Sequence, residues 1–320
     1  MTTIASPKNR LGTGPGKLAD RLFRGGSGLA AALIIVLLVG IGVMLLLTSI
    51  PAFREFGVVG FITGTSWNPV KAVYGALPYI VGTLLSSGIA LLISTPIAIL
   101  TAIYLAELAP RRVAIPLTFM VELIAAIPSV VIGLWGVFVL SPLLRGTVET
   151  WISSTIGKRI SLFEGPPLGI GLFAAGVILA IMILPTIVSV SREVITSVPM
   201  SQREAMFALG ATRWEVVTKA VVPAARSGIV GAIILGLGRA LGETMAVTMV
   251  IGNAPDLPTS LFDQSQTIAS KIATTFNEAT GELQISSLIA LGLILLVITI
   301  ILNIIARSLV WRTAGPVGAE

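Results

Sequence analysis

The chain has 320 residues, of which 55% are hydrophobic and 11% are charged, and its formal net charge is +6. A soluble domain carries about 25% charged residues, so this composition excludes an ordinary soluble enzyme, a disordered chain and a fibrous protein. The chain contains no Cys and no His, which excludes disulfides, Cys-ligated metal sites and imidazole relays. We expect a polytopic membrane protein whose positive charge lies in loops at one membrane face and does not bind nucleic acid.

Six segments are long and apolar enough to cross a bilayer as helices, which takes about 20 mostly apolar residues. The first two lack charges, the third contains Glu122, and the fifth contains Arg239 and Glu243. The predicted spans are residues 28–50, 76–105, 113–140, 168–190, 227–251 and 285–306. The expected fold class is therefore an all-α polytopic membrane protein with six transmembrane helices.

The loop charges predict the orientation of these spans. Fourteen Lys and Arg residues fall on one side, six on the other, and Arg239 lies within the membrane. The positive-inside rule then places both termini in the cytoplasm, with the basic tail close to anionic membrane lipids. We expect the chain to divide into a flexible tail (1–27), the first helix (28–50), an external connection (51–75), a five-helix core (76–311) and a second tail (312–320).

The cytoplasmic loop of this core, residues 191–226, contains two capping-box patterns, Ser201-x-x-Glu204 and Thr212-x-x-Glu215. In a capping box the hydroxyl accepts a backbone N–H of the first helical turn, and the carboxylate bonds back to the N–H of the hydroxyl residue. The sequence therefore predicts two short helices.

A glycine turn is predicted between these helices, because Gly210 suits the left-handed residue just past a helix end. The small side chains of Ala205 and Ala208 permit close approach of a partner. Two interpretations stay open on this evidence: a docking surface for another protein, and a helical loop that lies on the membrane surface.

Three charged residues are predicted inside the bilayer. Arg239 lies about 18 Å into the fifth span at 1.5 Å per residue, and Glu243, four residues later, shares its helical face. A guanidinium can bind a tetrahedral oxyanion through two hydrogen bonds, so Arg239 and Glu243 form either an anion passage point or an ion pair that fixes helix packing. Glu122 is a candidate partner for Arg239, and Pro128 breaks the third span beyond it, either to line a path or for packing alone.

The loop resembles a known motif. Glu204-Ala205-Met206 with Gly210 and Pro223 resembles the EAA loop of ABC-importer permeases, whose pattern is EAA, three residues, Gly, nine residues and I-x-L-P. The sequence departs from this pattern at Met206, Ala220 and Val222. The resemblance implies that the first short helix is a coupling helix in a groove of an ATPase subunit. The residues assigned to ATPase coupling are Ser201, Glu204, Ala205, Ala208, Gly210, Thr212 and Glu215.

Longer stretches resemble the phosphate-specific ABC-importer permease of the PstC type, and they are residues 67–69, 74–83, 122–136 and 236–253. This resemblance implies a type I, MetI-like permease fold without ATPase activity, and a heterodimer with a permease of the PstA type. It also implies two ATPase subunits that bind ATP and Mg²⁺, an external phosphate-binding protein, and no cofactor or metal on this chain. Arg239 and Glu243 match the charged residues of phosphate passage, and Glu122 matches a motif position of less defined role.

Other functions stay open from the residues alone. One is a permease for another oxyanion, such as molybdate or sulfate. Another is an anion channel or ion-coupled secondary transporter without an ATPase, against which the EAA-like loop argues. A membrane-embedded enzyme is disfavoured because the chain lacks His and Cys and has no paired carboxylates within one span.

Overall fold

The computed structural model describes residues 16–157 and 160–313. They divide into two units, the first ending at Leu47 and the second beginning at Thr48, and each is treated by itself. The described part of the first unit is the helix α1 (Gly16–Phe56), which continues into the second unit. The predicted flexible tail over 1–27 is wrong for residues 16–27, which form the first turns of α1. Lys, Leu, Ala and Arg favour the helix there, and residues 1–15 lie outside the described residues.

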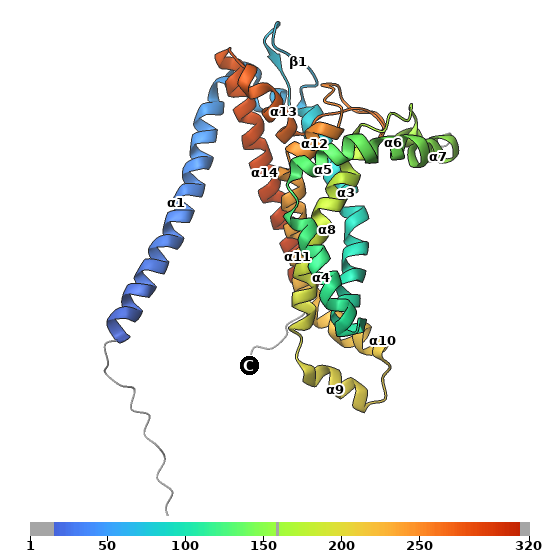
Figure 1. The fold of residues 1–320 in the computed structure, drawn as a ribbon. Helices are drawn as coiled ribbons and strands as arrows, with labels where there is room; N and C mark the ends of the chain where they lie inside the picture. The colour runs from blue at the N-terminus through green and yellow to red at the C-terminus, as the bar shows by residue number, and fades with distance from the viewer. Residues whose placement is uncertain (1–15, 158–159, 314–320) are drawn as a thin grey trace, which may run out of the picture. The chain divides into compact units, whose positions relative to one another are not determined.

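The second unit is built around a helix bundle with α8 (Leu172–Thr196) at its centre (Figure 1). This helix packs against α3 (Leu77–Ile103), α11 (Val222–Gly242) and α4 (Arg111–Ala126), while α14 (Glu282–Thr313) packs against α11. Gly176 permits the close approach of α8 to α3, since a Cβ there would lie 2.5 Å from Ile89 Cγ2. Small residues bring membrane helices together in this way.

The described residues contain six helices that are long and apolar enough to cross a membrane, which confirms the predicted number and the all-α class. The bounds of the second predicted span agree with α3 within two residues, while α8 and α14 match the fourth and sixth spans but end six and seven residues later than predicted. The third and fifth predicted spans are wrong as continuous helices, because the structure breaks both.

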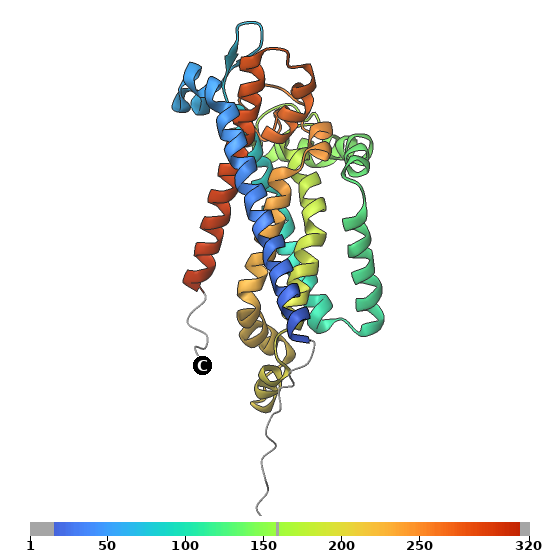
Figure 2. The same ribbon diagram turned by 90° about the vertical axis from the view of Figure 1, so that its left-hand side faces the viewer.

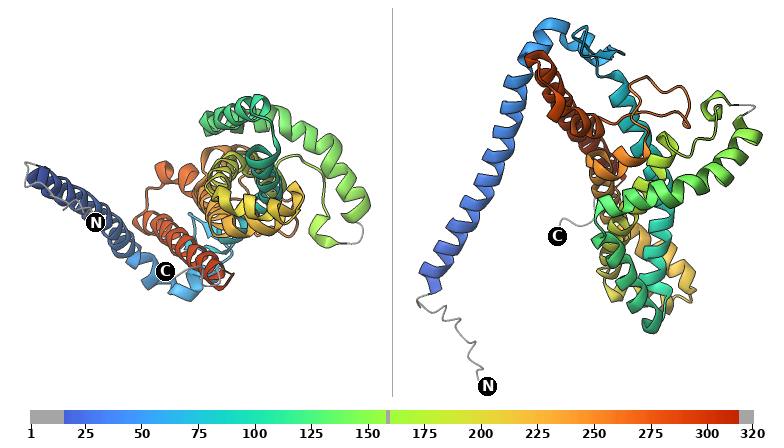
Figure 3. Two further views of the ribbon diagram at one scale, coloured as in Figure 1. Left: turned by 90° about the horizontal axis from the view of Figure 1, so that it is seen from below. Right: turned by 45° about the horizontal axis from the view of Figure 1, so that its top comes forward.

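The third predicted span, residues 113–140, ends as α4 at Ala126 and restarts at Ser129. Pro128 disfavours helical backbone at the residue before it, and it occupies the N-cap position of the new helix. The second part runs across one end of the bundle and away from it (Figures 1 and 3). It consists of α5 (Ser129–Trp135), the π-helix η2 (Gly136–Leu140), α6 (Ser141–Leu143), the π-helix η3 (Leu144–Val148), α7 (Glu149–Ile152) and the π-helix η4 (Ser153–Gly157).

The fifth predicted span, residues 227–251, breaks between α11 and the short helix α12 (Met245–Val250). Glu243 lies at the break with extended backbone (φ −68°, ψ 124°). The helix α12 packs closely against α5, since a Cβ on Gly133 would lie 2.7 Å from Met249 Sδ and 3.0 Å from Ala246 Cα. The outer parts of the two broken helices are therefore in direct contact.

One end of the bundle, here called the α13 end, is capped by short elements (Figure 2). The antiparallel strands β1 (Trp67–Asn68) and β2 (Val73–Tyr74) pair Trp67 with Tyr74. The loop before α13 covers the first turn of α8, because its carbonyls accept the N–H groups of Leu172 and Phe173. The remaining elements of this end are α2 (Val58–Thr63), the 3₁₀ helix η5 (Ser161–Phe163), α13 (Ile268–Thr275) and the 3₁₀ helix η7 (Phe276–Glu278).

The opposite end, here called the α9 end, carries the predicted loop helices (Figures 1 and 2). They are α9 (Met200–Ala208) and α10 (Arg213–Val216), and the π-helix η6 (Val217–Val221) joins α10 to α11. The π-helix η1 (Tyr104–Leu108) extends α3 at the same end. The bundle thus connects two differently built ends through continuous helices.

Candidate functional site

The helical hairpin predicted at residues 201–215 is present, but only one of its two capping boxes forms. Thr212 Oγ1 accepts the N–H of Glu215 at 3.4 Å, and the Thr212 N–H donates to Glu215 Oε2 at 3.0 Å. The predicted Ser201 box is wrong, since α9 begins at Met200 after Pro199 and no side chain caps it. Pro199 occupies the capping position, which places Ser201 inside the first turn.

Gly210 ends α9 as the sequence predicts. Its φ of +82° is left-handed, and its N–H donates to the Phe207 carbonyl while the Ala211 N–H donates to the Met206 carbonyl. This pair of bonds is a Schellman motif. The turn is therefore fixed by its own backbone before any partner binds.

The outer side of α9 is exposed. Glu204, Ala205 and Ala208 lie on it, as expected for residues that contact a partner. Leu209 is 84% exposed at the end of the helix, and the Trp214 ring is exposed on α10. These residues, here called the α9 surface, combine one carboxylate with apolar side chains at one end of the bundle.

Arg239 lies in the last turn of α11 and is exposed. Its Nη1 donates to Thr186 Oγ1 of α8 at 3.4 Å. The guanidinium forms no ion pair within the described part of the chain, where the ion pairs are Arg203–Glu107 and Lys219–Glu215. The described residues thus provide Arg239 with one hydroxyl acceptor and no packing ion pair, and its role in anion passage stays a prediction.

Glu243 is not a helical neighbour of Arg239, so the predicted shared helical face is wrong. The helix ends at Gly242, and Glu243 Oε1 instead accepts the N–H of Ala246 at 3.3 Å, in the first turn of α12. A carboxylate is favourable beside the N–H groups that begin a helix. Glu243 thereby bonds across the break between α11 and α12, and its side chain is half-buried.

Glu122 lies exposed on α4, and it forms no ion pair with Arg239 in the described structure. The three predicted passage residues thus lie on α4, on α11 and at the α11–α12 break, and the described contacts do not bring them into one closed site. The cleft between α8, α11 and α14 includes Leu235 and Arg307 but not Arg239. A second surface must complete any passage at Arg239.

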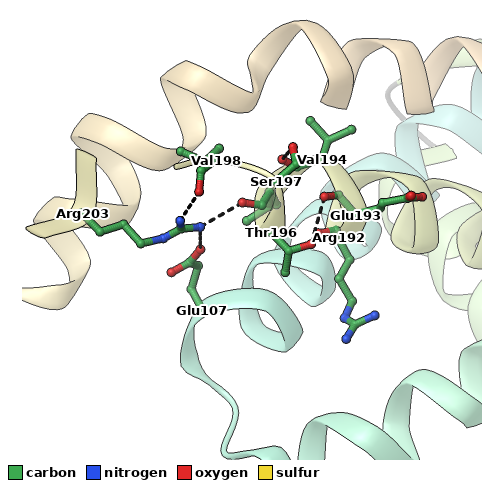
Figure 4. A network of polar contacts seen from close by, with 9 residues as sticks. Glu107, Arg192, Glu193, Val194, Thr196, Ser197, Val198 and Arg203 are labelled. Atoms are coloured by element: carbon green, nitrogen blue, oxygen red, sulfur yellow. Dashed lines mark hydrogen bonds and ion pairs between the residues drawn. The ribbon is translucent and has the colours of Figure 1, made fainter. Parts of the chain in front are cut away.

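Two buried cations escaped the sequence reasoning. Arg203 is only 8% exposed and pairs with Glu107 (Figure 4). Lys271 of α13 is also 8% exposed, and its Nζ lies 5.0 Å from the Trp67 ring centre and 5.4 Å from that of Tyr79. Burial lowers the pKa of Lys271 to about 8, and the charge of Glu278 opposes this shift. In the sequence, Arg203 and Lys271 are indistinguishable from other charged residues of the predicted loops, and no local signal indicates that they are buried.

The fold belongs to a known class. The structure aligns with a chain of a bacterial ABC transporter involved in the import of the acidic polysaccharide alginate, with TM-score 0.59 and 18% identity over 93% of this chain and 99% of that one. A structure of a bacterial alginate ABC transporter in complex with its pentasaccharide-bound periplasmic protein gives TM-score 0.61 and 20% identity over 94% and 99%. The chain therefore shares its fold with membrane chains of these ABC transporters.

Residues 94–314 match the family described as "Binding-protein-dependent transport system inner membrane component". The chain belongs to this family and is a multi-pass inner-membrane component. It is 48% identical to the phosphate transport system permease protein PstC of Mesorhizobium japonicum, over 94% of this chain and 93% of that protein. It is 46% identical to PstC of Haemophilus influenzae over 92% and 93%, and 38% identical to PstC 2 of Mycobacterium tuberculosis over 92% and 93%. These relatives confirm the resemblance drawn from the fifth-span motif.

Proposed function

We propose that the chain is the transmembrane permease subunit of an ATP-driven importer that carries inorganic phosphate across the cytoplasmic membrane. The substrate is taken from the relatives, which are named phosphate permeases and align over nearly the whole chain. The structural observation that carries the proposal is Arg239, whose guanidinium is exposed beside a helix break and forms no ion pair in the described part of the chain.

In this mechanism Arg239 meets the anion partway through the membrane. A guanidinium binds a phosphate through parallel N–H donors. Glu243 stays beside the break and repels an anion that remains bound, and Glu122 adds negative charge from α4. A path must release its substrate, so we place most of the selectivity in an external binding protein.

The other subunits are inferred from the family of the chain and its relatives, together with the open surroundings of Arg239. Arg239 is not enclosed by this chain, so a second permease of the PstA type would complete the path. The α9 surface would dock on one of two ATPase subunits, which bind ATP and Mg²⁺, while this chain performs no hydrolysis. Glu204, Ala205, Ala208 and Gly210 would lie at that contact, with Thr212 and Glu215 fixing its second helix and Ser201 in its first turn.

Both termini and the α9 surface would lie in the cytoplasm, as the loop charges indicate. The absence of Cys from the sequence allows a direct test by single cysteines. In intact cells, an impermeant maleimide should label Lys71→Cys at the α13 end, and it should label Thr218→Cys only after permeabilisation. The opposite labelling pattern would overturn the orientation.

Uptake by the reconstituted complex tests the transport function. Proteoliposomes with both permeases, the ATPase subunits and the binding protein should accumulate labelled phosphate only when ATP is inside. Arg239→Gln should lower uptake about 100-fold, the loss typical of one charge-stabilising donor. Arg54→Gln, which removes an exposed guanidinium near the end of α1, serves as the control and should leave uptake unchanged.

The alternatives have their own outcomes in this experiment. Uptake of molybdate or sulfate in place of phosphate would assign another oxyanion. Phosphate flux without ATP would indicate a channel or a secondary transporter. Full uptake by Arg239→Gln would remove Arg239 from the path.

A further inference from the structure

Arg203 lies on the side of α9 that faces the bundle, opposite the exposed α9 surface (Figure 4). Its Nη2 donates to Glu107 Oε1 at 2.6 Å and to the Ile195 carbonyl at 3.0 Å, and its Nη1 donates to the Val198 carbonyl. The side chains of Arg203 and Glu107 are 10% and 13% exposed. This arrangement, here called the Arg203 joint, connects three separate segments.

The joint completes the end of α8. The last carbonyls of a helix lack intrahelical partners, and a cation near them is favourable because the helix dipole is negative there. Two hydroxyls satisfy part of this end, since Thr196 Oγ1 donates to the Arg192 and Glu193 carbonyls and Ser197 Oγ donates to the Val194 carbonyl. The guanidinium of Arg203 adds donors from the next helix, to the Ile195 carbonyl in the last turn and to the Val198 carbonyl just beyond it.

The joint also reaches α3 through Glu107. This residue lies in η1, the π-helix that extends α3, where the Ala109 N–H donates to the Tyr104 carbonyl five residues back. A guanidinium presents several donors in a rigid plane, so one side chain can hold a carboxylate and two carbonyls at once. A Lys ammonium is a single point charge and cannot reproduce this geometry.

We propose that Arg203 is a positioning residue that fixes α9 to the ends of α3 and α8, so that both helices move together with α9 during transport. The two helices are the most closely packed pair of the bundle. A displacement of α9 by a partner would then reach the membrane helices directly, without depending on the connecting backbone. The assignment of α9 as the ATPase contact rests on the proposed function, whereas the mechanical connection rests on the contacts of this chain.

The first test separates coupling from assembly. Importer complexes with Arg203→Gln, Arg203→Lys and Glu107→Gln are compared for phosphate uptake per ATP hydrolysed. A coupling energy typical of linked sites corresponds to about tenfold, so Arg203→Gln should lower this ratio about tenfold while ATP hydrolysis and recovery of the complex stay near the parent values. Glu107→Gln keeps an acceptor for Nη2 and should lose less than Arg203→Gln.

A matched control uses the other ion pair of the same loop. Lys219 and Glu215 form an exposed i,i+4 pair at 3.0 Å, and Lys219→Gln breaks it without touching the joint. The uptake-to-hydrolysis ratio of Lys219→Gln should equal that of the parent.

The second test needs neither substrate nor ATPase. The cysteine-free chain is spin-labelled at Gln202→Cys on α9 and Leu108→Cys on η1, two exposed positions, and the distance distribution is measured by pulsed electron resonance. The parent should give a narrow distribution, and Arg203→Gln and Arg203→Lys a broad one. A narrow distribution in Arg203→Gln would overturn the joint.

The two tests fail in different ways. If the parent complex shows no ATP-driven uptake, the proposed function fails, while the spin-label result still decides whether α9 is fixed. If uptake and hydrolysis fall together with recovery of the complex, or if the ratio is unchanged, Arg203 has only a folding role and the positioning proposal is wrong.

Discussion

Arg203 and Lys271 are equally buried cations at opposite ends of the bundle, each 8% exposed, and they are held in different ways. Arg203 has a carboxylate and two backbone carbonyls as partners. Lys271 forms no ion pair within the described residues and lies over the faces of Trp67 and Tyr79. The two cations are thus equally buried, but hydrogen-bond acceptors surround Arg203 and aromatic rings lie beside Lys271.

The difference determines which of the two charges can change. Arg keeps its proton at any pH that a protein survives, so the α9 end carries a permanent charge in a fixed network. A Lys that loses water without gaining an acceptor is less stable in its charged form, which lowers the pKa of Lys271 to about 8. The α13 end therefore carries a positive charge, that of Lys271, which is lost when the pH rises above about 8.

The largest expected effect is at the Arg203 joint. Arg203→Ala leaves the Glu107 carboxylate and two carbonyls without this partner, and breaking a buried pair from one side costs about 3–5 kcal/mol of unfolding free energy. Thermal unfolding in detergent should show it. Lys219→Ala removes an exposed pair and should cost at most about 1 kcal/mol; equal losses in the two variants would contradict the comparison.

The α13 end should depend more on close backbone contact than on charge. A Cβ on Gly82 of α3 would lie 2.2 Å from the carbonyl oxygen of Gln266, which cannot move without the loop before α13. Gly82→Ala should therefore destabilise the protein by about 1–3 kcal/mol. Gly88→Ala lies on the same helix with no atom within 4 Å of its Cβ, and a similar loss there would refute the packing argument.

The pH dependence sharpens the same contrast. Because the pKa of Lys271 falls from 10.5 to about 8 on folding, the unfolded chain binds more protons between these values. Stability should rise with pH in this interval, with a slope on the order of 1 kcal/mol per pH unit, and this contribution should be constant below pH 8. Unfolding temperatures measured from pH 7 to pH 10 should show the rise in the parent and lack it in Lys271→Met. Identical slopes would exclude Lys271 as the source.

The smallest effect separates the two predicted caps of the α9 end. Thr212→Ala removes a capping box that forms and should cost about 1 kcal/mol. Ser201→Ala removes a hydroxyl that caps nothing, so its effect should stay within about 0.5 kcal/mol. Thermal unfolding of the two variants compares the two caps directly. A larger loss of stability in Ser201→Ala than in Thr212→Ala would mean that the Ser201 capping box does form.

Local patterns predicted much of this molecule. The number of spans, the Gly210 turn and the Thr212 box each depend on residues close together in the sequence, whereas the third and fifth predicted spans were wrong as continuous helices. Ser201 failed as a cap because Pro199, two residues earlier, takes the capping position. No proline lies at the break at Glu243, so the sequence gives no local signal for it. The packing of α12 against α5 supports the break, and this contact between distant segments cannot be read from the sequence.

The candidate site was predictable in its residues but not in its arrangement. Arg239 and Glu243 stand out in the sequence because charges are costly inside a membrane. Their predicted position on one helical face assumed an unbroken helix, and the helix ends at Gly242. Arg203 and Glu107 are 96 positions apart in sequence, and each looks like an ordinary loop charge. Only the folded chain shows that they meet.

The contact between Glu107 and Arg203 depends on the number of residues in the π-helix η1 as well as on the charges of the two side chains. The buried side of α3 repeats every four residues through Ser94, Ala98 and Ala102, and Glu107 follows five residues later, the spacing of a π turn. Each residue of an α-helix turns the chain by about 100°. Inserting one Ala after Ala106 would lengthen this spacing to six residues, so it would rotate Glu107 away from the guanidinium while leaving both partners in the sequence, and the spin-label distance should broaden as in Arg203→Gln. Insertions in η1 should consequently be tolerated less well than most substitutions there.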